Sequence, residues 1–89
     1  MADDRLDRKT LFVPGARYRV LESVVSGGFN SGFTAGEELR FGRTTYSHYD
    51  GCHVYEFKAN DGSLREYWLG DEQPIGLIRT LFKRMGLFG

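Results

Sequence analysis

Two Asp-Gly pairs, Asp50-Gly51 and Asp61-Gly62, constrain the fold of this chain more than any other feature. Each pair lies between runs rich in apolar and aromatic residues. Asp-Gly in that setting is a strong signal for a β-hairpin, because the tight turn needs the positive φ that Gly adopts easily. The two turns therefore predict a meander of three antiparallel strands. Its strands are expected at residues 39–49, 52–59 and 63–69.

The rest of the chain supplies elements before and after this meander. Residues 17–25 alternate apolar and polar side chains and predict a first strand. A glycine-rich loop follows at residues 26–38, and Gly42 is expected to form a β-bulge. Residues 74–85 show a helical apolar period with Pro74 at the first position, which predicts a C-terminal helix of about three turns.

Length and charge narrow the class of protein. A chain of 89 residues is one small domain, which we place at residues 13–89, behind a mobile or capping arm at residues 1–12. Twelve basic and twelve acidic residues give a formal net charge of zero, which disfavours a role that depends on nucleic acid. No apolar run approaches the roughly 20 residues of a membrane span, and the first residues do not form a signal peptide. A single cysteine excludes an internal disulfide and suits the cytoplasm.

The stretch YSHYDGCHVYEF, residues 46–57, contains both histidines and the only cysteine, and we interpret it mainly as a turn between strands. If Asp50-Gly51 is a two-residue loop, His48 faces His53 across the hairpin and Cys52 points to the opposite face. A catalytic Cys–His pair needs contact between the two side chains, so an enzyme resting on Cys52 is our third choice. Two histidines and one cysteine do not complete a structural zinc site. We therefore expect no catalytic residues, no metal and no cofactor.

The aromatic residues leave two alternatives open. Those on the meander either fill the core or form an exposed platform for a partner, and those of the 26–38 loop either pin the loop or meet a partner. We expect Trp68 to be buried beneath the C-terminal helix, against Leu39 or Phe41. The candidate binding residues are Tyr46, Tyr55, Tyr67, Phe29 and Phe33.

The predicted helix 74–85 has one apolar side and one basic side. Such a helix packs on its own domain, on a second copy of the chain, or on an anionic membrane, and the last is the least favoured. The apolar stripe is broader than one end of a small domain needs. We therefore expect Phe82, Met85 and Phe88 to serve a symmetric dimer or a partner groove.

The order of these elements resembles a small SH3-like β-barrel, in which the step GEELRF is similar to the acidic turn that feeds the second strand. The spaced pattern PGARYRV, FTAGEELRF, YDGCHVYEF and WLGD, over residues 13–71, also resembles a family of small uncharacterised bacterial domains. The resemblance implies a mainly β fold, a partly open SH3-like barrel of about five strands with a C-terminal α-helix. It carries no known activity.

We therefore expect a non-catalytic bacterial interaction module whose partner is an unknown protein or a second copy of the chain. The alternative is a weak single-stranded nucleic-acid binder that uses the aromatic sheet face and the basic tail. A series of salt concentrations separates the two, because contacts to phosphate give a steep dependence on salt.

Overall fold

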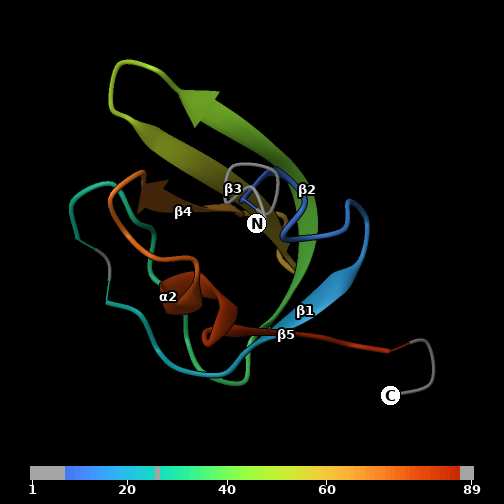
Figure 1. Cartoon of the computed structure of the whole chain (residues 1–89). Coiled ribbons are helices and arrows are strands. Elements are labelled where there is room, and N and C mark those ends of the chain that lie inside the picture. The colour runs from blue at the N-terminus through green and yellow to red at the C-terminus, as the bar shows by residue number, and fades with distance from the viewer. Residues whose placement is uncertain (1–7, 26, 87–89) are drawn as a thin grey trace.

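The computed structural model describes residues 8–25 and 27–86, and it shows one antiparallel sheet of five strands (Figure 1). The order of strands across the sheet is β4-β3-β2-β1-β5. The sheet is not closed into a barrel, because β4 and β5 remain separate edge strands. The strands are β1 (Arg17–Val20), β2 (Glu38–Ser47), β3 (Cys52–Ala59), β4 (Leu64–Gly70) and β5 (Phe82–Arg84).

The predicted meander is formed by β2, β3 and β4, which pair as consecutive antiparallel neighbours. The bulge expected at Gly42 is confirmed, since the register between β2 and β3 shifts between Phe41 and Arg43. A Cβ atom at Gly42 would lie 3.3 Å from the carbonyl oxygen of Glu56, so glycine suits this close approach. The predicted strand 17–25 is confirmed only over the four residues of β1.

The loop between β2 and β3 differs from the prediction. Ser47 pairs with Cys52 and Tyr46 pairs with His53, so four residues and not two form the turn. The amide of Gly51, at φ +63°, donates to the carbonyl of Ser47 and closes this longer loop. The prediction that His48 faces His53 across the hairpin was therefore wrong, because the extra two residues place His48 in the loop.

The C-terminal segment is the largest correction. The helix predicted over residues 74–85 is limited to α2 (Gly76–Arg79), and residues 82–84 form strand β5. An isolated helix of a dozen residues is marginal in water, whereas pairing with β1 satisfies the backbone of residues 82–84. The pairing also places Phe82 opposite Val20, where its side chain is buried at 6% exposure.

One face of the sheet, called the inner face here, carries the core. Figure 1 shows the strands curled around this side, where α2 also lies. Phe12, from the predicted N-terminal arm, packs against the rings of Tyr18, Tyr55 and Phe57, so the described end of that arm caps the core. The buried apolar cluster is Phe12, Tyr18, Val20, Phe33, Leu39, Phe41, Tyr55, Phe57, Ala59, Tyr67, Leu69, Ile78, Leu81 and Phe82.

Within residues 8–25 and 27–86, no helix has the length and apolar character needed to cross a bilayer.

Candidate binding surface on the outer sheet face

The face opposite the core, called the outer face here, carries a line of basic side chains. Successive residues of a strand point to opposite faces, so the neighbours of buried residues point outward. Arg17 pairs with Arg40, and Arg40 pairs with Lys58 on the next strand. All three side chains are exposed. These residues, Lys58, Arg40 and Arg17, are paired neighbours across β3, β2 and β1 and are called the cation row below.

The cation row has no negative partner in the part of the chain that the structure describes. Arg40 donates from Nη1 to the carbonyl oxygen of Gly15 at 3.1 Å, which is a backbone contact. Neighbouring cations are paired by contrast: Arg19 lies 3.2 Å from Glu38, and Arg43 lies 3.0 Å from Glu56. Like charges directly opposite each other in a sheet are destabilising, so the row costs the fold some stability.

Apolar side chains stand at both ends of the cation row. Leu64 on β4 pairs with Lys58 and is 68% exposed. At the other end the amide of Met85 donates to the carbonyl of Arg17 at 2.9 Å, which places Met85 beside Arg17. The predicted interface residue Met85 is thus half-buried at the edge of the sheet.

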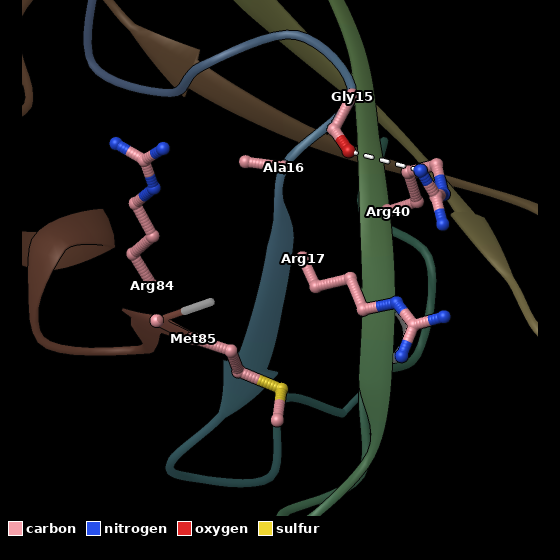
Figure 2. A pocket seen from close by; sticks show the side chains of 7 residues that line it. Gly15, Ala16, Arg17, Arg40, Arg84 and Met85 are labelled. Carbon is pink, nitrogen blue, oxygen red and sulfur yellow. Dashed lines mark hydrogen bonds between the residues drawn. The ribbon is translucent and has the colours of Figure 1, made fainter. Parts of the chain in front are cut away.

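A hollow adjoins each end of the row. The hollow at Met85 has a volume of about 430 Å³ and includes Ala16, Arg17 and Arg40 in its lining. Figure 2 shows that Arg17 and Arg40 extend to one side of β1, while Arg84 extends to the other. The register agrees, because Arg84 pairs with the core residue Tyr18. Arg84 is therefore not a member of the cation row.

The hollow at the Leu64 end is smaller, at about 240 Å³. It is lined by Gly42, Arg43, Glu56, Phe57, Lys58 and Leu64. The bulge contributes to this hollow, since Gly42 has no side chain to fill it.

A pair of stacked aromatic rings lies further along the outer face. Phe29 stacks on Trp68 with a centroid distance of 4.7 Å and an interplanar angle of 18°. The loop is fixed there because Asn30 accepts from the Trp68 amide at 2.6 Å and Ser31 bonds with the backbone of Glu66. Phe29 is nevertheless 61% exposed. The expected burial of Trp68 beneath the helix was wrong, because Trp68 belongs to the face that α2 does not cover.

A second polar cavity lies at the end of the β2–β3 hairpin. It has a volume of about 440 Å³ and is lined by Lys9, Tyr46, His48, His53 and Asp71. The Tyr46 hydroxyl donates to Asp71 Oδ2 at 2.5 Å, and His53 Nδ1 lies 3.8 Å from Asp71 Oδ1. The sequence did not identify Asp71 as a site residue. In the structure, Cys52 pairs with Gly70, and this pairing brings the residue after β4 to the hairpin.

The thiol of Cys52 is poorly suited to nucleophilic chemistry. Partial burial raises its pKa, and the negative charges of Asp50 and Asp71 raise it further. The thiol lies within 3.4 Å of the Asp50 carbonyl oxygen, and the buried His53 lies on the opposite face of β3. A raised pKa leaves less of the reactive thiolate at neutral pH.

The candidate residues from the sequence are distributed over three environments. Tyr55, Tyr67 and Phe33 lie in the core, so the platform that was to include them is not an exposed surface; burial also raises the pKa of Tyr67. Tyr46 lines the hairpin cavity and Phe29 stays on the outer face. Phe82 is in the core and so is not available to a dimer, and Phe88 lies outside the described residues. The described residues contain no group of three side chains placed to hold a metal ion.

Comparison with known proteins shows the fold alone. An integron cassette protein from the mobile metagenome of Vibrio cholerae has a similar structure, with a TM-score of 0.65. The two chains are 21% identical, and the match covers 84% of this chain and 90% of the other. No family model and no curated protein matches the sequence.

Proposed function

We propose that this chain is a non-catalytic interaction module that binds a protein partner on its outer sheet face. The observation that carries the proposal is the Phe29–Trp68 stack, in which a largely exposed phenylalanine is held in a fixed place. Large aromatic side chains dominate the binding energy of protein interfaces, and a ring that is already fixed loses little entropy on binding. The raised pKa of Cys52 supports the non-catalytic part.

The proposal keeps two finer expectations from the sequence. The first is the resemblance to an SH3-like barrel: we propose that this small curled sheet, like such a barrel, presents one face to a partner. A cytoplasmic location is retained because the chain has a single thiol and no disulfide partner for it.

A peptide-display selection tests this function. Random twelve-residue peptides are selected on the wild-type protein and then measured on Phe29→Ser and Trp68→Thr. We expect the enriched peptides to lose at least about tenfold in affinity on both variants, the scale of a hot-spot side chain. Tyr49→Ser is the matched control, because Tyr49 is a fully exposed aromatic residue on the β2–β3 loop. A selection that enriches nothing, or peptides that bind Phe29→Ser as well as wild type, would contradict the proposal.

A second candidate function is weak binding of single-stranded nucleic acid. The observation that favours it is the uncovered ring of Phe29 on the same face as the cation row, since a base stacks on such a ring and phosphates bind cations. Lys83 and Arg84 of the basic tail lie at the neighbouring edge. A labelled oligothymidine titrated at 50 and 200 mM salt tests this alternative, and phosphate binding should weaken steeply over that range.

A further inference from the structure

The cation row and its two ends form a five-residue line across the whole sheet. From β4 to the residue that follows β5, the line consists of Leu64, Lys58, Arg40, Arg17 and Met85. Its ends are apolar and each adjoins a hollow, and its three central positions are exposed cations. The pattern differs from a uniformly basic surface, in which the ends would have no reason to be apolar.

Within the described residues no carboxylate pairs with a cation of this line, and Arg40 bonds only to the carbonyl oxygen of Gly15. Glu38 and Glu56 stand in the adjacent rows and are each engaged with another arginine. No negative charge in residues 8–25 and 27–86 therefore neutralises the line, and a bound partner that carries carboxylates would do so. We infer that the line is the recognition site for an extended acidic peptide segment with apolar ends. This inference rests on the proposed function, because it assumes that the outer face binds a protein.

The dimensions fix the length of the segment. Neighbouring strands are about 4.8 Å apart, so the four steps from Leu64 to Met85 span about 19 Å. In an extended peptide, alternate side chains point to one face and are about 6.7 Å apart, so four of them span about 20 Å. A peptide that crosses the strands thus contacts the line with four side chains from seven residues. The matching pattern is apolar, any, acidic, any, acidic, any, apolar.

The chemistry at each position favours a peptide over nucleic acid. The acidic side chains meet Lys58, Arg40 and Arg17, and arginine binds a carboxylate through two parallel N–H donors. The apolar side chains meet Leu64 and Met85 and enter the adjoining hollows. A nucleic-acid backbone gives the cations phosphates but brings nothing apolar to the exposed Leu64.

Two peptides of identical composition test the pattern. In LSESESL the leucines and glutamates share one face, whereas in SLESELS the leucines point to the opposite face from the glutamates. Both are capped at their ends, labelled with fluorescein and titrated by anisotropy at 50 mM salt, beside a labelled oligothymidine of ten nucleotides. We expect LSESESL to bind at least about fivefold more tightly than SLESELS, since each buried leucine contributes favourably.

The variants locate the binding to the line. Arg40→Gln combined with Lys58→Gln should weaken LSESESL at least about tenfold, because it removes two charge-assisted contacts. Arg79→Gln is the matched control, since Arg79 is an exposed cation on α2 and away from the row. Thermal unfolding of the double variant guards against misfolding, because removing like charges should leave its Tm equal to or above that of wild type.

Three outcomes overturn the inference. They are equal binding of the two peptides, equal binding of LSESESL by wild type and the double variant, and tighter binding of the oligothymidine than of LSESESL. None of these outcomes contradicts the proposed function if the binding of the displayed peptides still depends on Phe29 and Trp68. If instead LSESESL binds as expected and the displayed peptides are indifferent to those two residues, the aromatic site is wrong and the cation row remains.

Discussion

The inner and outer faces of this sheet are formed by the same strands, but their side chains have opposite effects on the stability of the fold. On the inner face the core side chains pack against one another, as in Phe41 opposite Phe57, whose rings meet edge to face. On the outer face Arg40 stands opposite Arg17 and Lys58, which weakens the fold. A small domain has little stability to spare, so the comparison indicates that the outer face is shaped by something other than folding.

The largest effect is expected on the inner face, at Phe57. Its ring is 1% exposed and stacks on Phe82 at a centroid distance of 4.7 Å. Phe57→Ala should lower the free energy of unfolding by about 3–5 kcal/mol, measured by urea denaturation. Its neighbour on the same strand, Lys58→Ala, should change stability by less than about 0.5 kcal/mol. Similar losses for both variants would erase the difference between the two faces.

Phe82 in β5 and Met85, the residue that follows β5, give the same comparison and test the corrected C-terminal structure. Phe82→Ala should cost about 3 kcal/mol, because Phe82 packs in the core. Met85→Ser, at the outer edge, should cost less than about 1 kcal/mol. Sedimentation of both variants separates this expectation from a dimer: loss of dimer by Phe82→Ala without loss of stability would restore the interface role predicted from the sequence.

Arg40 is expected to show a gain of stability. Arg40→Gln removes repulsion with both Arg17 and Lys58, and we expect the free energy of unfolding to rise by about 0.2–1 kcal/mol at low salt. Added salt screens these charges, so the gain should shrink at 1 M salt. The opposite sign at low salt would mean that the bond from Arg40 to the Gly15 carbonyl outweighs the repulsion.

The sequence predicted the parts of the fold that depend on local signals. The two Asp-Gly pairs predicted the second turn and strand β3, and Gly42 predicted the bulge, without any knowledge of distant contacts. The prediction was wrong where the outcome depends on contacts far along the chain. A helical apolar period describes residues 74–85 well, but the open edge of β1 decides that residues 82–84 extend.

The candidate site was predictable only once the register was known. Arg17, Arg40 and Lys58 are 41 positions apart from first to last, and each looks like an ordinary exposed cation in its own segment. Only the pairings of β1, β2 and β3 bring them into one line. A four-residue loop in place of two residues likewise pairs His53 with Tyr46 instead of His48, because turn length sets the register of a hairpin.

The alkylation rate of Cys52 tests whether the thiol of this outer-face residue is activated. The raised pKa of its thiol means that the folded protein holds less thiolate than the unfolded chain at any pH below that value. Alkylation by iodoacetamide at pH 8 should therefore be slower in buffer than in 8 M urea. The difference should narrow as the pH rises through the folded pKa. Faster alkylation of the folded protein would indicate an activated thiol and would reopen the enzymatic alternative.

The smallest effect is expected at Asp61, a surface charge that is fully engaged and so contrasts with the cation row. The hydroxyl of Ser63 donates to Asp61 Oδ1 at 2.6 Å and its amide donates at 2.9 Å. These bonds lower the pKa of Asp61, with a weaker contribution from Arg65. Because the folded pKa is below the unfolded value of about 3.9, the bonds stabilise the fold above that value and lose their effect as the pH falls through the folded pKa. Asp61→Asn should therefore be less stable than wild type at pH 6 and approach it at pH 2, measured by urea denaturation at each pH. A constant difference between the two proteins from pH 6 to pH 2 would show that the turn is held by geometry alone, and that engaged and unengaged surface charges matter equally little to this fold.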